Sequence, residues 1–159
     1  MNFLKFIFAM FLSFLPGIVG LIVAPIVGGD NLWYTSLNVS VLTPAGWVFS
    51  VVWTILYFLL GLALFFVMKT DSSQKKYNKT NAYVLFVINI IFNVLWTFSF
   101  FGAHLMETAL LILIVLIVNA IFMARAFYKI NQAAFWLTLP YIVWLFFAFY
   151  LNGMIIYLN

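Results

Sequence analysis

The side chains that could do chemistry in this chain are tryptophans, tyrosines and amides at helical spacing inside apolar segments. Phe49, Trp53, Tyr57 and Gly61 fall four apart, so on a helix they share one face. Two later segments repeat the pattern with amides added: one face carries Asn89, Asn93, Trp96 and Phe100, and another carries Tyr141, Trp144, Ala148 and Asn152. Such faces suit a flat, largely apolar ligand, because binding pockets are mostly apolar with a few orienting polar groups.

Ordinary helix packing is the alternative interpretation of these faces. An aromatic stripe is typical of helices that pack on one another, and Asn89 and Asn119 are sufficiently explained as hydrogen-bonding partners between helices. The presence of Trp53, Trp96 and Trp144 at similar depths in three segments favours an aromatic-lined pocket.

The usual catalytic and metal-binding sets are missing from the sequence. There is no cysteine, which excludes disulfides, iron–sulfur clusters and thiolate chemistry. His104 is the single histidine, and one histidine without cysteines or clustered carboxylates makes no metal site. Glu107 is expected in the first turn of a helix, where the dipole favours a carboxylate. No acidic residue lies deep in an apolar segment, which disfavours an ion-coupled transporter. We expect no metal and no cofactor.

The elements that position these faces must be membrane-spanning helices. The 159 residues are 68% hydrophobic and 6% charged, whereas soluble domains carry about 25% charged residues. Crossing a hydrocarbon core takes about 20 apolar residues, and lipid cannot pair with backbone amides, so the spans must be helical. We predict an all-α integral membrane protein with a single domain over residues 1–159. Its five helices are expected at residues 3–28, 44–68, 80–102, 106–128 and 132–157, the first kinked near Pro16 or Pro25.

The basic residues indicate how the bundle is oriented. With five spans, the N-terminus and the loops after the second and fourth helices share one side of the membrane. All seven basic residues fall there: Lys5, Lys69, Lys75, Lys76, Lys79, Arg125 and Lys129. The positive-inside rule therefore predicts a cytoplasmic N-terminus, with the C-terminus and the Trp33 loop outside. These scattered charges form no patch that could follow a phosphate backbone, so no nucleic acid partner is expected.

Four short motifs occur in order along the expected helices. They are Trp33-Tyr34-x-x-Leu37, Pro44 with Trp47 and Trp53-Thr54-x-Leu56-Tyr57-x-x-x-Gly61, Asn93-x-x-Trp96-x-x-x-Phe100-Phe101-Gly102, and Pro140-Tyr141-x-x-Trp144-x-x-Phe147-Ala148-x-x-Leu151-Asn152. Each motif alone is weak, but together they cover almost the whole chain. By these four motifs and their order, the chain resembles the translocator protein family (TspO/MBR), also called the tryptophan-rich sensory protein or peripheral benzodiazepine receptor family.

The resemblance implies a five-helix bundle, often a homodimer, with a pocket beneath the loop that joins the first two helices. Family members bind porphyrins such as protoporphyrin IX, benzodiazepine-type drugs and, in animals, cholesterol; some bacterial members are reported to degrade porphyrin in light. The ligand-binding residues that carry over are Trp33, Trp53, Tyr57, Asn93, Trp96, Trp144, Ala148 and Leu151. Trp53 and Trp144 are the pair tied to porphyrin breakdown, and they would be catalytic only if that reaction occurs.

The chain also departs from the family pattern. In residues 38–45 it lacks the usual lysine, tryptophan and two of the prolines, so we expect a more mobile loop. The glutamine usual at position 89 is shortened to Asn89. Gly153 and Met154 break the cholesterol consensus of the last helix, and cholesterol binding is not expected.

Three functions stay open on the sequence. The first is a membrane receptor for a metal-free tetrapyrrole, in its transport or regulation, with the ligand stacked on Trp53, Trp96 and Trp144 and hydrogen-bonded at one edge by Asn93. The expected tetrapyrrole is metal-free because His104 lies in a turn and offers no axial ligand to haem iron in the pocket. The alternatives are a light-dependent porphyrin-degrading enzyme and a structural or regulatory membrane protein with a vestigial pocket. The sequence does not determine the natural ligand, the membrane or the oligomeric state.

Overall fold

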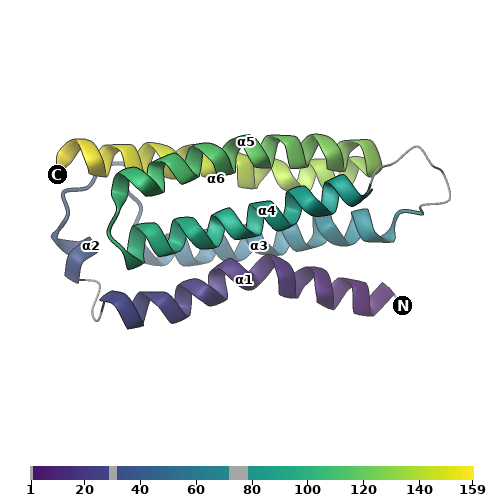
Figure 1. The fold of residues 1–159 in the computed structure, drawn as a ribbon, viewed down its shortest axis with the longest axis horizontal. Helices are drawn as coiled ribbons and strands as arrows, with labels where there is room; N and C mark the ends of the chain where they lie inside the picture. Colours follow the sequence, from purple (N-terminus) through teal and green to yellow (C-terminus); the bar gives the residue numbers. More distant parts are fainter. Residues whose placement is uncertain (1, 29–31, 72–78) are drawn as a thin grey trace.

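Five long helices run alongside one another, with the two chain ends at opposite ends of the bundle (Figure 1). The computed structural model describes residues 2–28, 32–71 and 79–159. The elements in chain order are α1 (Asn2–Gly28), α2 (Leu32–Ser36), α3 (Gly46–Lys69), α4 (Lys79–Thr97), the π-helical turn η1 (Phe98–Gly102), α5 (Met106–Ile130) and α6 (Gln132–Leu158). Five helices are long and apolar enough to cross a membrane. The predicted fold class, an all-α bundle of five transmembrane helices, is confirmed.

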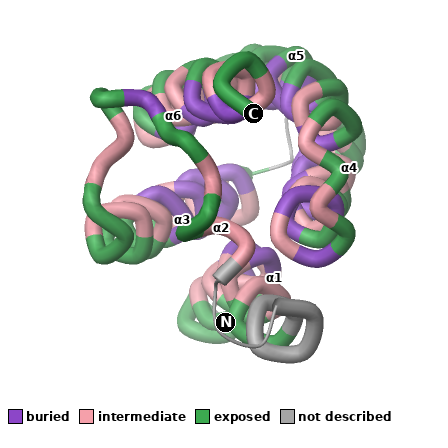
Figure 2. Tube along the Cα trace, turned by 90° about the vertical axis from the view of Figure 1, so that its left-hand side faces the viewer, coloured by how far each residue is buried: buried purple, intermediate pink, exposed green. Residues whose placement is uncertain are grey.

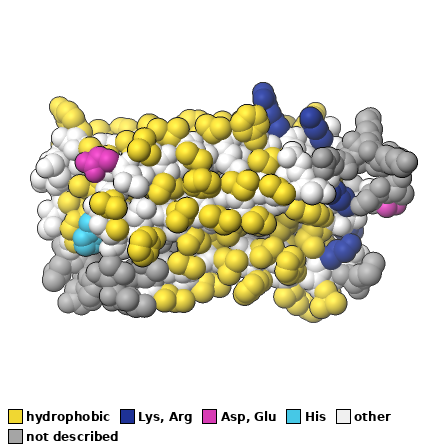
Figure 3. Space-filling model, viewed as in Figure 1, with side chains coloured by type: hydrophobic (Ala, Val, Ile, Leu, Met, Phe, Trp, Pro, Cys, Tyr) yellow, Lys and Arg dark blue, Asp and Glu magenta, His cyan; other side chains and the backbone are white. Residues whose placement is uncertain are grey.

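The long helices form a closed ring when the bundle is viewed from its end (Figure 2). Going round the ring, α1 packs on α3, α3 on α6, α6 on α5, α5 on α4, and α4 on α1. Buried positions on α3 to α6 turn toward the middle of the ring, whereas exposed positions face outward. The outer face is covered with hydrophobic side chains over most of its length (Figure 3), as expected of a surface in contact with lipid.

Local hydrogen bonds explain where several helices begin and end. Asn131 closes α5 by donating its backbone N–H to Phe127 O at 2.7 Å, and its side-chain oxygen accepts from Ala134 N at 3.2 Å to cap α6. This one residue therefore joins two antiparallel helices. The second long helix begins at Gly46 instead of Pro44. Thr43 is held in a turn by a bond from its N–H to Ser40 O at 2.9 Å, which leaves Ala45 in an extended conformation before the helix.

The last turn of the third span is π-helical, which the sequence did not predict. Thr97 Oγ1 donates to Asn93 O at 3.1 Å, and Ala103 N donates to Phe98 O at 2.8 Å, five residues earlier. A π turn inserts an extra residue and so rotates the side chains that follow it. It sets the direction of Phe100, which is buried.

Close helix packing fixes α1 against α3 at Gly61. A Cβ placed on Gly61 would lie 2.7 Å from both Met10 Sδ and Ser13 Oγ, so a larger residue would require these side chains of α1 to move. The first helix bends in its middle part (Figure 1), and of the two prolines expected to bend it, Pro16 lies in that part of the sequence.

The described Lys and Arg side chains gather at the end of the bundle where the chain begins (Figure 3). They include Lys5, which donates to Met68 O at 3.3 Å, and Lys79, which donates to Thr70 O. This segregation agrees with the charge distribution on which the predicted orientation rests. The orientation itself stays a prediction.

Candidate ligand-binding site

The indole of Trp53 lies at the centre of an aromatic cluster drawn from three helices. Its ring centroid is 5.3 Å from that of Tyr57, 6.3 Å from Trp96, 6.3 Å from Tyr141 and 6.4 Å from Trp144. Because α3 and α4 are not neighbours in the ring of helices, the contact between Trp53 and Trp96 crosses the middle of the bundle. The structure thus brings together the three indoles that the sequence placed at similar depths, and Trp53, Trp96 and Trp144 are all only partly buried.

A second group of rings connects this cluster to the loop after α1. Trp96 stacks on Phe100 with centroids 5.6 Å apart, and Phe100 contacts Trp33 at 5.6 Å. Trp33 in turn stacks on His104, with centroids 4.0 Å apart and planes within 7° of parallel. Phe100 therefore connects Trp33 to the Trp53 cluster. The sequence placed Phe100 on the same helix face as Trp96 but did not predict this connection. His104 has a φ of 57° in the turn before α5 and lies outside the Trp53 cluster.

The remaining predicted site residues on α6 lie toward its C-terminal end from Trp144. Ala148 and Leu151 follow it by about one and two helical turns, and they are 8% and 6% exposed. Phe49 packs edge-on against Trp144 with centroids 5.9 Å apart. These residues extend the apolar wall formed by α3 and α6.

A buried chain of hydrogen bonds runs beside the aromatic cluster and ties four helices together. Tyr57 Oη donates to Asn93 Oδ1 at 3.1 Å, and Asn93 Nδ2 donates to Tyr141 Oη at 2.9 Å. Tyr141 Oη then donates to Asn89 Oδ1 at 2.8 Å, and Asn89 Nδ2 donates to Asn119 Oδ1 at 3.1 Å. All five side chains are buried, and each of them has at least one hydrogen bond within the chain, as a low-dielectric interior favours.

This network changes the part that Asn93 can play. Its amide oxygen and amide nitrogen each have a protein partner, so any ligand contact would use the second lone pair or the second N–H. Asn89 and Asn119 were each expected to hydrogen-bond between helices, and the structure pairs them with each other. The sequence did not predict the central role of Tyr141 in this network, because the position of a residue on a helix face does not reveal which amides lie across the bundle.

Two indole donors in the cluster lack a protein partner. Trp96 Nε1 and Trp144 Nε1 are buried and have no hydrogen bond to any described residue. Unpaired buried donors are uncommon, because each loses its water without replacement. Asn152 Oδ1 is also unpaired, although its amide nitrogen donates to Met106 O at 3.0 Å. The two indole N–H groups are therefore the places where a ligand acceptor would gain most.

The loop between α2 and α3 is hydrogen-bonded to the C-terminal part of α6. Asn159 Oδ1 accepts from Asn38 N at 2.9 Å, and Asn159 Nδ2 donates to Asn38 O at 3.0 Å. Buried Ser40 hydrogen-bonds Tyr150 Oη at 3.0 Å. On the short helix α2, burial raises the pKa of Tyr34 above its ordinary value, and the ring of Tyr34 packs on Phe100. The expected mobility of residues 38–45 stays a prediction, but these bonds would restrain it.

Comparison with known proteins places the whole chain in context. The TspO/MBR family model matches residues 9–158. The tryptophan-rich protein TspO of Chlorobaculum tepidum is 35% identical over 127 residues, which is 80% of this chain and 79% of that protein. The tryptophan-rich sensory protein of Cereibacter sphaeroides is 33% identical over 141 residues, 86% of this chain and 82% of that protein. The human translocator protein is 29% identical over 145 residues, 91% of this chain and 85% of that protein.

Proposed function

The chain belongs to the TspO/MBR family of integral, multi-pass membrane proteins, and from that premise we propose that it is a membrane receptor for a flat, largely apolar ligand of the porphyrin class. Protoporphyrin IX is the first candidate, and tetrapyrrole transport or regulation is the corresponding role. The observation that carries the proposal is the pair of buried, unpartnered indole donors on Trp96 and Trp144 beside the aromatic face of Trp53.

The chemistry of these groups specifies the ligand. Aromatic faces from Trp53 and Trp96 favour a planar π system, because offset and edge-on ring contacts stabilise beyond the area they bury. The two indole N–H groups require acceptors on that ligand, such as a carboxylate, a carbonyl or a ring nitrogen. The rings nearest to parallel with Trp53 are those of Tyr57 and Trp96, with centroids 5.3 and 6.3 Å away, whereas a guest sandwiched between two aromatic planes needs about 7 Å of separation. Ligand entry therefore turns the partly buried indoles apart, while the hydrogen-bonded chain from Tyr57 to Asn119 keeps the helices in place.

A metal-free ligand is proposed because of where His104 lies. Its ring stacks on Trp33 instead of facing the Trp53 cluster, so it would not serve as an axial ligand to iron there. Titration with protoporphyrin IX and with haem tests this point. Haem binding that is much tighter, with a histidine-type absorption spectrum, contradicts it.

Quenching of tryptophan fluorescence by protoporphyrin IX measures the binding itself. Trp96→Phe and Trp144→Phe each keep an aromatic ring and remove the N–H, so each should weaken binding about fivefold, the worth of one net hydrogen bond of about 1 kcal/mol. Trp47→Phe is the control, because Trp47 is 70% exposed on the same helix as Trp53. Unchanged affinity in both cluster variants removes the proposal. A folded protein that binds no porphyrin favours the structural or regulatory alternative with a vestigial pocket.

Light-dependent degradation of porphyrin is the second candidate, favoured by the contact between Trp53 and Trp144. Their rings meet at 6.4 Å and at right angles, so both indoles would adjoin one bound macrocycle, and Trp53 and Trp144 would then be the catalytic residues. The test is the loss of porphyrin absorbance under illumination. Trp53→Phe and Trp144→Phe should abolish the loss and Trp47→Phe should not; equal bleaching in all three proteins excludes an enzymatic role for the pair.

A homodimer is proposed only as the family's usual assembly. Exposed apolar residues cover the outer face of α4, among them Val84, Val87, Ile91 and Leu95, and such a face suits either lipid or a second copy. Cross-linking in detergent distinguishes the two.

A further inference from the structure

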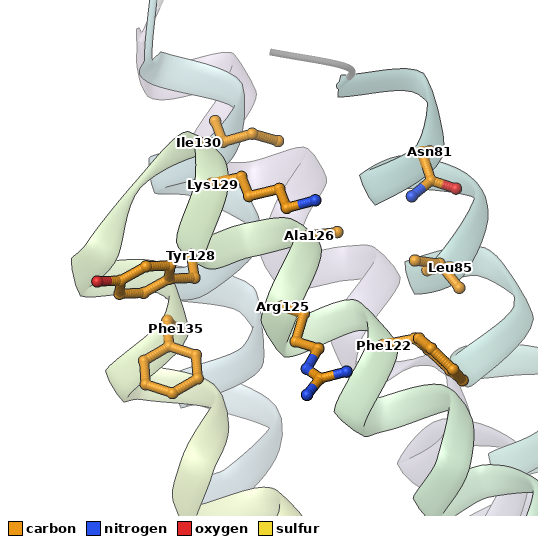
Figure 4. A pocket seen from close by; sticks show the side chains of 9 residues that line it. All are labelled: Asn81, Leu85, Phe122, Arg125, Ala126, Tyr128, Lys129, Ile130 and Phe135. Atoms are coloured by element: carbon orange, nitrogen blue, oxygen red, sulfur yellow. The ribbon is translucent and has the colours of Figure 1, made fainter. Parts of the chain in front are cut away.

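A groove of about 1000 Å³ lies at the basic end of the bundle (Figure 4). It is lined by Asn81, Leu85, Phe122, Arg125, Ala126, Tyr128, Lys129, Ile130 and Phe135. Along α4, Leu85 and Trp96 are separated by about 16 Å at 1.5 Å per residue. The groove is therefore distinct from the proposed porphyrin site, and neither the family resemblance nor the aromatic motifs assign it a ligand.

Two cations without protein counter-ions stand in this groove. Arg125 and Lys129 are one helical turn apart on α5 and both line the groove; Lys129 extends toward α4, whereas the Arg125 guanidinium points along α5 away from Ile130 (Figure 4). Within the part of the chain that the structure describes, neither has a hydrogen-bond or ion-pair partner, and no carboxylate lines the groove. An anion that bridges both side chains would form charge-assisted hydrogen bonds, which are stronger than neutral ones.

The rest of the lining is apolar and continues into the span. Phe122 lies almost one turn from Arg125 toward the middle of α5, whereas Ala126 on α5 and Leu85 on α4 line the groove between Arg125 and the end of the bundle. Arg125 itself is more than one turn inside the end of α5 at Ile130. A guanidinium at that depth is unfavourable unless it reaches the interface or meets a partner. An amphiphile fits this mixed lining, with its negative charge near the two cations and its apolar part against Leu85 and Phe122.

We propose that this groove binds one anionic glycerophospholipid from the leaflet at the basic end of the bundle. Its phosphate lies between Arg125 and Lys129, its headgroup lies at the polar rim beside Asn81, and the upper part of one acyl chain runs along Leu85 and Phe122. Basic pockets between transmembrane helices on the cytoplasmic side, where the positive-inside rule predicts this end of the bundle, are suited to such headgroups. The apolar lining separates this ligand from a free phosphate, which would gain nothing from Leu85 and Phe122.

Thermal unfolding of the full chain in an uncharged detergent tests the proposal. The probes are dioctanoyl phosphatidylglycerol, dioctanoyl phosphatidylcholine, and glycerol 3-phosphate as the headgroup without tails. We expect a saturable rise in Tm with phosphatidylglycerol and none with the other two at the same concentration. Equal effects of the two lipids overturn the proposal, and so does an equal effect of glycerol 3-phosphate, which would indicate a site for free anions only.

Two charge-matched variants locate the site. Arg125→Gln should raise the apparent Kd for phosphatidylglycerol about fivefold, the effect of one basic residue near an anionic lipid. Lys69→Gln removes the same charge from an exposed position at the same end, outside the groove, and should leave the Kd unchanged. Lys129→Gln, also at an exposed position, provides a second variant if Arg125→Gln fails to fold. Equal Kd values for the groove variants and Lys69→Gln overturn the assignment.

Discussion

Removal of one hydroxyl from the centre of the bundle should loosen it measurably. Tyr141 is fully buried, and its Oη accepts from Asn93 Nδ2 at 2.9 Å and donates to Asn89 Oδ1 at 2.8 Å. Tyr141→Phe therefore breaks two hydrogen bonds between α6 and α4 without creating a large cavity. Interhelical bonds inside membranes are worth about 0.6 to 1.7 kcal/mol each, so the variant should lose about 1 to 3 kcal/mol of unfolding free energy.

Tyr57→Phe provides the internal comparison. Tyr57 is at the end of the same chain and makes one bond, to Asn93 Oδ1 at 3.1 Å. It is 6% exposed, so the two tyrosines share nearly the same environment. The expected loss is about 0.6 to 1.7 kcal/mol, half that of Tyr141→Phe. Tyr157→Phe is the control for the substitution itself, because Tyr157 is 82% exposed, and it should fall within about 0.5 kcal/mol of the parent.

The assay is reversible unfolding in mixed micelles, with a denaturing detergent titrated against helical circular dichroism. The order of stability should be parent and Tyr157→Phe first, Tyr57→Phe next and Tyr141→Phe last. If Tyr141→Phe is as stable as Tyr157→Phe, the hydrogen-bonded chain does not hold α6 to α4. If Tyr57→Phe is the more destabilising of the two, Tyr141 is not the central member.

Three further results are expected from other parts of the molecule. In the same unfolding assay, Gly61→Ala should lower the unfolding free energy by about 1 to 3 kcal/mol, because the added methyl group overpacks against side chains of α1. Gly153→Ala is the control: its Cβ would meet nothing within 4 Å, so it should be neutral or stabilise by up to about 1 kcal/mol. Equal effects of the two substitutions would show that Gly61 is not a close contact with α1. Asn159→Ala removes both hydrogen bonds to the Asn38 backbone. Each bond is worth about 1 kcal/mol, so the loss of each should speed amide hydrogen exchange in residues 37–43 roughly fivefold. An unchanged exchange rate would show that another contact holds the loop. Because the chain has no cysteine, single Asn2→Cys and Asn159→Cys variants can be labelled cleanly in intact cells, where an impermeant thiol reagent should modify only the second; the reverse result would invert the predicted orientation.

Much of the fold was predictable because the solvent imposes it. Backbone groups in lipid must pair within the segment, so each long apolar run had to be a helix. The structure has long helices over all five expected segments, and the differences are local: α3 begins at Gly46 because Thr43 is occupied in a turn, and the third span ends in a π turn at Phe98–Gly102. Both depend on single hydrogen bonds that periodicity does not report.

The candidate site was predictable only one helix at a time. Spacing placed Trp53, Trp96 and Trp144 on their faces, and burial of the amides followed from the expense of an unpaired polar group in lipid. Spacing did not reveal that Tyr141 joins Asn93 to Asn89, nor that Phe100 connects Trp33 to Trp96. Those contacts depend on the rotation of each helix about its axis relative to the others.

The amino-acid sequence alone determined that this chain lies in a membrane, how many times it crosses, which end of the bundle is basic and which face of each helix carries indoles and amides. Composition and a period of 3.6 residues are sufficient for these conclusions, because they depend on one segment and its solvent. The tertiary structure alone decided which partners meet: the closed ring of helices, the amide and tyrosine chain through its middle, the bond between Asn38 and Asn159, and the groove at Arg125 and Lys129. Each of these joins residues far apart in the chain, and only packing in three dimensions selects among the many pairings that the same helix faces allow.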